Sequence, residues 1–202
     1  MADEELELGR VAGRFVSRRE CLQGLKILSV GAAVALCLPR GLRAAAAAAE
    51  AGAGTVRIEV FSPAGRSLGV QTLPKVVKTE AEWRAQLTPI SFQITRRAGT
   101  ERADLSDHAH PDGLYHCICC ETALYDSRTK FDSGTGWPSF YQPISKLNVV
   151  ESRDDSFGME RIAVSCRRCD AHLGHVFDDG PPPTGLRYCM NAVAMHFVPR
   201  AA

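Results

Sequence analysis

Cys117-Ile118-Cys119-Cys120 and Cys166-Arg167-Arg168-Cys169 are the two stretches that decide how this chain of 202 residues folds. Each Cys-x-x-Cys element can curl around one side of a metal ion, and two of them supply the four thiolates that zinc prefers. Because the two elements lie far apart in the sequence, the metal would clamp distant segments of a sheet and not organise a small finger. The predicted ligands of one structural zinc ion per chain are Cys117, Cys120, Cys166 and Cys169.

The paired cysteines admit other interpretations. Two disulfides, or one redox-active Cys-x-x-Cys, would suit an oxidising compartment, although two pairs of matched spacing favour zinc. Cys119 could replace Cys120 as a ligand, but only Cys120 reproduces the spacing of the second pair. Four protein ligands leave no position for water or substrate, so we expect the metal to be structural.

The chain after residue 113 has no helical period. It consists of short apolar runs separated by Gly, Pro, Asp and Asn, which is typical of an antiparallel β domain. The runs that we expect to be strands cover 114–118, 141–144, 147–151, 161–165, 175–177 and 193–198.

The region before residue 100 has different signals. Alternating apolar and polar residues over 56–61 and 68–73, with a Ser-Pro-Ala-Gly turn between them, predict a β-hairpin. Thr79 followed by Glu82 predicts a capped helix over 79–87, and a second short helix is expected over 90–95. The fold class expected overall is mainly β, an antiparallel β-sheet domain with short N-terminal helices.

Length and charge exclude several classes of function. The chain is long enough for one catalytic domain with a proper core. Its formal net charge is +1, so the chain has no large excess of positive charge that would favour binding to nucleic acid or to an anionic membrane surface.

Residues 1–50 resemble a targeting signal more than a part of the folded domain. Arg18 and Arg19 precede an apolar run over 25–38 and then an alanine-rich stretch, as in a twin-arginine export signal. The run is shorter than the roughly 20 residues that span a bilayer, so we expect no stable membrane insertion after processing. An alanine-rich packed helix is the alternative. The expected domains are the signal over 1–50, a hairpin extension over 51–74 and a catalytic domain over 75–200, exported to the periplasm.

Cys189 is a thiol outside the paired cysteines and the candidate nucleophile. Arg187 precedes it by two residues, and a nearby guanidinium favours the thiolate. His172 and His175 offer imidazoles that could bind a substrate or shuttle a proton, and Asn191 adds an amide two residues after the thiol.

Each of these residues has a structural interpretation too. A buried cysteine is usually a small core residue, the histidines could be a structural pair or alternative zinc ligands, and asparagine is a common turn former. The segment 132–140 shifts the balance toward function. Its glycines let the backbone be approached closely, and Trp137 offers an indole face to a methyl or sulfur group.

Several motifs together resemble the B-type methionine sulfoxide reductases, which reduce the R epimer of methionine sulfoxide in proteins. They are Gly99-Thr100-Glu101, the residues 113–117, 130–140 and 172–177, and Arg187-Tyr188-Cys189-Met190-Asn191. The resemblance extends over about residues 75 to 200 and is specific, because unrelated motifs recur in the family's order. It implies an antiparallel domain of the β-tent type with a structural zinc site.

The resemblance also implies roles for the site residues. Cys189 attacks the sulfoxide sulfur and becomes a sulfenic acid, which a thiol then removes through a disulfide. Arg187 stabilises the thiolate. The roles implied for the other residues are orientation or protonation of the sulfoxide oxygen, by His172, His175 and Asn191, and contact with the methyl end, by Trp137 and Phe177.

One departure from the family pattern concerns regeneration. Many members carry a resolving cysteine where this chain has Thr135, so an external thiol is expected to reduce Cys189, with a thioredoxin-like protein as partner and oxidised proteins as substrate. Cys119 is the remaining unassigned thiol after residue 50, but its place in a zinc knuckle makes movement costly.

We expect a monomer. The rival functions are a non-catalytic zinc-binding β module that recognises a protein partner, and a thiol-disulfide oxidoreductase.

Overall fold

The structure is a computed structural model that describes residues 54–103 and 112–201. The export signal expected over 1–50 lies outside these ranges and stays a prediction. Within them, no helix is both long enough and apolar enough to cross a bilayer.

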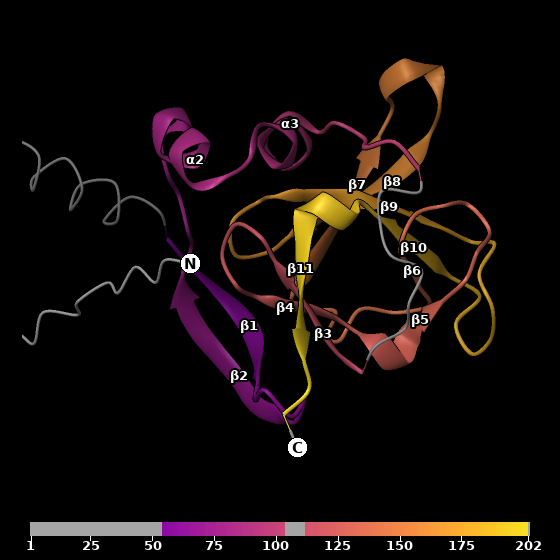
Figure 1. The fold of residues 1–202 in the computed structure, drawn as a ribbon, viewed down its shortest axis with the longest axis horizontal. Coiled ribbons are helices and arrows are strands. Elements are labelled where there is room, and N and C mark those ends of the chain that lie inside the picture. Colours follow the sequence, from indigo (N-terminus) through magenta and orange to yellow (C-terminus); the bar gives the residue numbers. More distant parts are fainter. Residues whose placement is uncertain (1–53, 104–111, 202) are drawn as a thin grey trace, which may run out of the picture. The chain divides into compact units, whose positions relative to one another are not determined.

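The described residues are mainly β, as expected, and their paired strands are antiparallel (Figure 1). The first sheet is the hairpin of β1 (Thr55–Phe61) and β2 (Ser67–Pro74). The second has the order β11-β3-β4, from β11 (Met195–Pro199), β3 (Gly113–Cys117) and β4 (Ala123–Asp126). The third has the order β5-β6-β10-β9-β8-β7, from β5 (Lys130–Phe131), β6 (Ser139–Phe140), β7 (Val149–Asp154), β8 (Arg161–Cys166), β9 (His172–Phe177) and β10 (Arg187–Met190).

Two short helices, α2 (Glu80–Gln86) and α3 (Pro89–Arg97), follow the hairpin and lie at one end of the described domain in Figure 1. The capping box that the sequence predicts is present, because Thr79 accepts the N–H of Glu82 while Glu82 accepts the N–H of Thr79. Both helices bury one apolar side and so cover the core: Trp83 in α2 is 3% exposed and Phe92 in α3 is 2% exposed.

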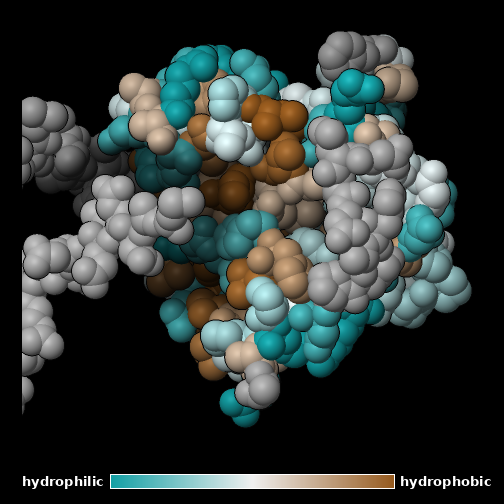
Figure 2. All heavy atoms as spheres, viewed as in Figure 1, coloured by the Kyte–Doolittle hydropathy of each residue, from teal (hydrophilic) through white to brown (hydrophobic). Residues whose placement is uncertain are grey.

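The core below the helices contains the largest buried aromatic side chains. Tyr125 from β4 stacks on Phe140 from β6 with ring centroids 4.4 Å apart, so the core joins the two larger sheets. Figure 2 shows apolar side chains in the hollow between the helices and the strands, and hydrophilic side chains over much of the helices.

One strand prediction was wrong, and another was wrong in where the strand begins. Residues 141–144 form an irregular segment after β6, where the backbone N–H groups of Tyr141 and Ile144 bond isolated carbonyls instead of a ladder. The expected strand over 193–198 begins instead with a short 3₁₀ turn, η4 (Ala192–Ala194), before β11. The cause is the carboxylate of Glu101, which accepts the N–H groups of Ala192 and Val193 and so removes them from any strand pairing.

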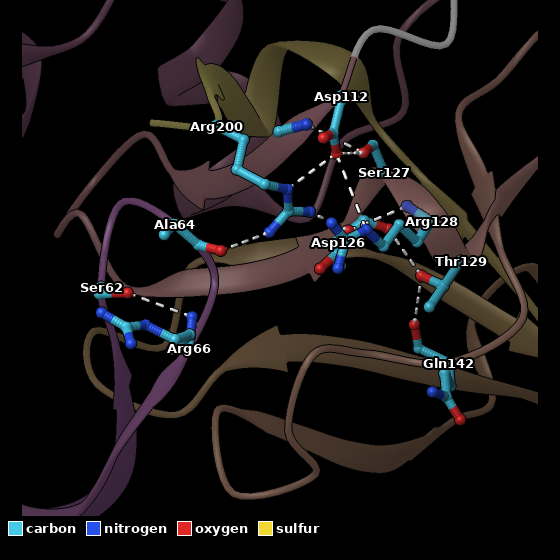
Figure 3. Close-up of polar contacts among 11 residues, drawn as sticks. Ser62, Ala64, Arg66, Asp112, Asp126, Ser127, Arg128, Thr129, Gln142 and Arg200 are labelled. Atoms are coloured by element: carbon cyan, nitrogen blue, oxygen red, sulfur yellow. Dashed lines mark hydrogen bonds and ion pairs between the residues drawn. The ribbon is translucent and has the colours of Figure 1, made fainter. Parts of the chain in front are cut away.

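A buried amide attaches β1 of the hairpin to the rest of the domain. Asn148 accepts the N–H of Glu59 through Oδ1 at 2.8 Å, and its Nδ2 donates to the carbonyls of Glu59 and Ala123, each at 2.8 Å. Near the C-terminus, Arg200 donates to Asp112, to Asp126 and to the carbonyl of Ala64 in the hairpin turn (Figure 3).

Candidate functional site

Each Cys-x-x-Cys element forms the same tight turn. The N–H of Glu121 donates to the carbonyl of Cys117 at 2.9 Å, and the N–H of Asp170 donates to that of Cys166 at 2.9 Å. Glu121 and Asp170 have φ angles of 62° and 56°, the left-handed conformation that lets each turn close. The two turns therefore present their sulfur pairs in the same way.

The four predicted sulfurs converge in the structure. Those of Cys117, Cys120, Cys166 and Cys169 lie within 4.8 Å of one another, and all four residues are buried. The distance is 3.6 Å between the sulfurs of Cys117 and Cys169, and 3.5 Å between those of Cys120 and Cys166. Zinc–sulfur bonds of about 2.3 Å in a tetrahedron place sulfurs about 3.8 Å apart, so this set of donors fits one zinc ion.

The cluster joins two sheets. Cys117 ends β3 of the three-stranded sheet, and Cys166 ends β8 of the six-stranded sheet. Cys119 is 3% exposed and does not belong to the cluster, which agrees with the choice of Cys120 as ligand. A metal held here would fix the packing of the two sheets.

Cys189 lies in the middle of the six-stranded sheet. Its strand β10 runs between β6 and β9, so Cys189 is the register partner of Ser139 on one side and of His175 on the other. The residue is half-buried, unlike the four clustered cysteines.

The surroundings of the Cys189 sulfur act on its pKa in opposite directions. Burial raises the pKa, and this effect outweighs the lowering by the Arg187 charge and by hydrogen bonds from Thr135, Arg187 and Ser139. The prediction that Arg187 favours the thiolate is thus correct in direction, but the net pKa lies above the ordinary value. A thiol with a raised pKa ionises more readily when a base accepts its proton.

Arg187 is itself held in place. Its Nε and Nη2 donate to the two carboxylate oxygens of Asp179, each at 2.8 Å, and its guanidinium lies 4.5 Å from the ring centre of Phe177. A paired and stacked guanidinium has one orientation, which keeps its charge beside Cys189.

A cavity of about 150 Å³ opens beside Cys189. Trp137 and Phe177 supply aromatic walls, and the Trp137 indole is oriented by donating its Nε1–H to the carbonyl of Glu101 at 3.3 Å. The residues that line the cavity are Thr100, Trp137, Arg161, Gly174, His175, Phe177, Cys189, Met190 and Asn191. The cavity has room for a small group with an apolar end and a polar end.

His175 is the imidazole that this cavity shares with Cys189. Its Nε2 lies 2.7 Å from Oδ2 of Asp154, and the same oxygen accepts Nη2 of Arg161 at 2.9 Å. A hydrogen bond from Ser156, followed by that of His175, holds the pKa of Asp154 well below its usual range. Asp154 therefore stays ionised and orients the His175 ring through this hydrogen bond.

His172 lies in an adjoining cavity of about 480 Å³, which His175 and Asp154 also line, and its ring packs edge-on against His175 at 5.3 Å. Burial, and next the neighbouring His175, lowers its pKa to about 4. Among the described residues its buried Nε2 has no hydrogen-bond partner. His172 is thus a neutral imidazole with one free nitrogen, and the structure places it outside the lining of the smaller cavity.

Asn191 lines the smaller cavity, but both ends of its amide are occupied. Oδ1 accepts the N–H of Glu101 at 3.0 Å, and Nδ2 donates to the carbonyl of Leu173 at 3.0 Å. Asn191 therefore orients the backbone around Cys189. The glycine at 174 permits the same close packing, because a Cβ there would lie 2.1 Å from the carbonyl oxygen of Cys189.

Sequence reasoning assigned no role to three charged residues of the site. Glu101 is 5% exposed and organises the turn after β10 through its carboxylate, and burial raises its pKa. Asp154 and Arg161 come from β7 and β8 and meet at His175. Glu101 stands in a motif quoted above, whereas nothing in the local sequence around Asp154 or Arg161 points to His175.

Comparison with known proteins gives one consistent result. The model of the SelR domain matches residues 87–199. The peptide methionine sulfoxide reductase MsrB of Pseudomonas entomophila (strain L48) is 55% identical over 130 residues, which cover 63% of this chain and 99% of the relative. The MsrB of Pseudomonas putida (strain W619) is 56% identical over 130 residues, covering 63% and 98%. That of Pseudomonas syringae pv. syringae (strain B728a) is 55% identical over 131 residues, covering 64% and 100%.

Proposed function

This chain belongs to the SelR family, the B-type peptide methionine sulfoxide reductases, and reduces methionine-R-sulfoxide in proteins; we propose that Cys189 is the sulfur that attacks the sulfoxide. One observation carries the assignment of residues: the half-buried Cys189 opens into the same small cavity as Trp137, Phe177 and His175. The rival of a non-catalytic zinc-binding module is not favoured, because the chain matches peptide methionine sulfoxide reductases over nearly the whole length of those relatives.

The substrate pose follows from the cavity walls. The methyl group of the sulfoxide lies against Trp137 and Phe177, since aromatic faces bind methyl and sulfur groups. The sulfoxide oxygen then faces the polar side of the cavity, which His175 and Arg161 line. With the methyl group and the oxygen on different walls and the rest of the substrate chain directed to solvent, three directions at the chiral sulfur are fixed, so only one epimer fits.

His175 moves the proton that the chemistry requires. The Cys189 thiol ionises by giving its proton to His175, whose imidazolium the Asp154 carboxylate stabilises. Arg187 and the hydroxyls of Thr135 and Ser139 then stabilise the thiolate. As the thiolate attacks, a bond forms between Cys189 and the substrate sulfur, and His175 returns the proton to the sulfoxide oxygen. That new S–S bond then breaks as the hydroxyl shifts from the substrate sulfur to the Cys189 sulfur, so that the thioether leaves.

The products of this step balance. One thiol and one sulfoxide give one thioether, the repaired methionine, and one sulfenic acid on Cys189. A first external thiol condenses with the sulfenic acid to a mixed disulfide and releases water. A second thiol breaks that disulfide, restores the Cys189 thiol and leaves as the oxidised reductant.

Regeneration uses an external thiol because Thr135, not a cysteine, contacts the Cys189 sulfur. Cys119 is buried against the cysteine cluster and near Thr95, which argues against its recruitment. We expect Thr135→Cys to form an internal disulfide with Cys189 after one turnover, visible by mass spectrometry of peptides. The wild-type chain treated in the same way should show a sulfenic acid or a mixed disulfide. A Cys119–Cys189 disulfide in the wild-type chain would contradict this route.

We assign one structural zinc ion to Cys117, Cys120, Cys166 and Cys169. The support is the fit of the four buried sulfurs to a tetrahedron and their origin in two sheets. When bound, zinc holds the two Cys-x-x-Cys turns together and takes no part in sulfoxide reduction. A purified chain that folds fully without metal would contradict the assignment.

Export to the periplasm by the twin-arginine route is a separate proposal. It is based on Arg18, Arg19 and the apolar run that follows. Changing both arginines to lysine should retain the full chain in the cytoplasm of its host, as judged by cell fractionation. An unchanged distribution would contradict the proposal.

The decisive assay separates the two epimers of the substrate. Purified protein with dithiothreitol should consume the R epimer of a dabsyl methionine sulfoxide and leave the S epimer. Consumption of the S epimer would overturn the subclass, and consumption of neither would overturn the function. Zinc content near zero with intact disulfide exchange would favour the thiol-disulfide oxidoreductase instead.

A further inference from the structure

A second group of potential metal ligands lies on the three-stranded sheet, outside the site described above. His116 on β3 and His196 on β11 are register partners, and their rings lie 5.6 Å apart with an interplanar angle of 40°. Glu121, in the turn after β3, places its carboxylate 3.0 Å from Nε2 of His196. Two imidazoles and a carboxylate therefore face one another.

The ring of His116 is oriented in the way that metal-bound histidines are. Its Nδ1 lies 2.9 Å from the carbonyl oxygen of Glu121, which makes Nδ1 the donor and leaves Nε2 as the nitrogen available to a ligand. Metal-ligating histidines almost always donate their other ring N–H to a carbonyl or carboxylate in this manner. This bond is an observation independent of the clustering itself.

The distances and exposure suit a metal that enters from solvent. One ring nitrogen of each histidine and one carboxylate oxygen lie within 4.8 Å of one another, and a metal about 2.1 Å from each donor would draw the donors closer together. The side chains of His196 and Glu121 are 31% and 69% exposed, so they have the freedom to rotate. A cavity of about 110 Å³ is lined by His116 and Glu121, but not by His196, and so adjoins the group of three on one side.

The backbone that carries these side chains is rigid. The two histidines are fixed by the ladder between β3 and β11, and Glu121 is fixed in the left-handed turn of the first cysteine pair. Arg168 also lines the cavity and opposes a cation there, whereas Glu59, on the same lining, favours one. The nearby charges thus offset each other, and the ligands decide.

We propose that His116, Glu121 and His196 form a second site for one divalent transition-metal ion, separate from the four-cysteine centre. Two imidazoles and one carboxylate are the donors that zinc accepts alongside water. Three protein ligands leave coordination positions open, so this ion exchanges with solvent, unlike an ion enclosed by four cysteines. The second site takes no part in sulfoxide reduction.

The test measures zinc bound per chain at a buffered free zinc concentration, with the full chain carrying no histidine tag. The readout is the difference in zinc content between the wild type and His196→Gln, by elemental analysis after equilibrium dialysis. We expect the wild type to bind one zinc more than His196→Gln, and Glu121→Gln to bind the second zinc at least about tenfold more weakly. This difference does not depend on whether the cysteines hold zinc.

The matched control is Glu160→Gln, which removes a carboxylate of similar exposure, 65% against 69%, that pairs with Arg153 on the surface. It should bind as much zinc as the wild type. Circular dichroism and R-sulfoxide reduction, expected to be unchanged in all three variants, show that each variant is folded. Equal zinc contents in the wild type and His196→Gln, or an equal loss in Glu160→Gln, would overturn the proposal.

Discussion

The two environments of cysteine in this domain differ in what faces the sulfur. The four paired cysteines face one another in the buried seam between two sheets, whereas Cys189 faces a guanidinium, two hydroxyls and an aromatic-walled cavity. Sulfurs that converge on one point can share a metal, and a sulfur with an open side can meet a substrate. Geometry thus suits the same residue type to a structural role in one place and to a reactive role in the other.

The largest expected effect is on the structural side of this comparison. Cys166→Ser removes one of the four converging sulfurs, so we expect loss of the metal and of about 5 kcal/mol or more of the free energy of unfolding. Chemical denaturation with elemental analysis measures both. Cys119→Ser changes a buried sulfur outside the cluster and should retain the metal. Equal stability of Cys166→Ser and wild type would remove the distinction between the two environments.

On the reactive side, Cys189→Ser should lower kcat/KM for the R epimer by at least about a thousandfold, because the hydroxyl is a far weaker nucleophile. Metal content and the denaturation midpoint should stay close to those of the wild type, since Cys189 is half-buried and outside the cluster. Residual activity within tenfold of wild type would show that another sulfur is the nucleophile.

The pH dependence of stability sharpens the contrast within the reactive region. The pKa of His172 is lowered to about 4 by burial, and next by His175. Between pH 6.5 and 4 the unfolded chain therefore binds a proton at His172 that the folded chain does not bind. This residue's contribution to the free energy of unfolding is complete above pH 6.5. It is lost as the pH falls toward 4, by up to about 3 kcal/mol. His172→Gln should lack this part of the slope in denaturation curves. Identical slopes in the two proteins would contradict the burial of a neutral imidazole.

The smallest expected effect concerns the carboxylate beside His175. Asp154→Asn should lower kcat/KM by about ten- to a hundredfold, because His175 loses the negative charge that stabilises its proton. The pH profile of kcat/KM should change as well, which loss of packing alone would not cause. Asp155→Asn is the matched control, since Asp155 pairs with Arg153 at the surface. An equal effect of both changes would indicate a role in folding.

Local signals predicted much of the fold. The capped helix and the hairpin were predicted because a capping box and a turn flanked by alternating residues act over a few positions. Strands of two to four residues, such as β4, β6 and β10, are too short to show a period of their own. The assignment of residues 141–144 failed because apolar side chains there pack without a paired strand.

The sequence by itself determined which four sulfurs converge, and it supplied the candidate nucleophile Cys189 and the aromatic residue Trp137 that lines its cavity, because spacing and residue type are local properties. Only the tertiary structure decided which charges surround them. Asp154 and Arg161 reach His175 from two other strands, and Glu101 reaches the turn after β10 from a segment about 90 residues earlier. Such partners are chosen by the register of the strands and by packing between segments, which depend on the whole chain at once.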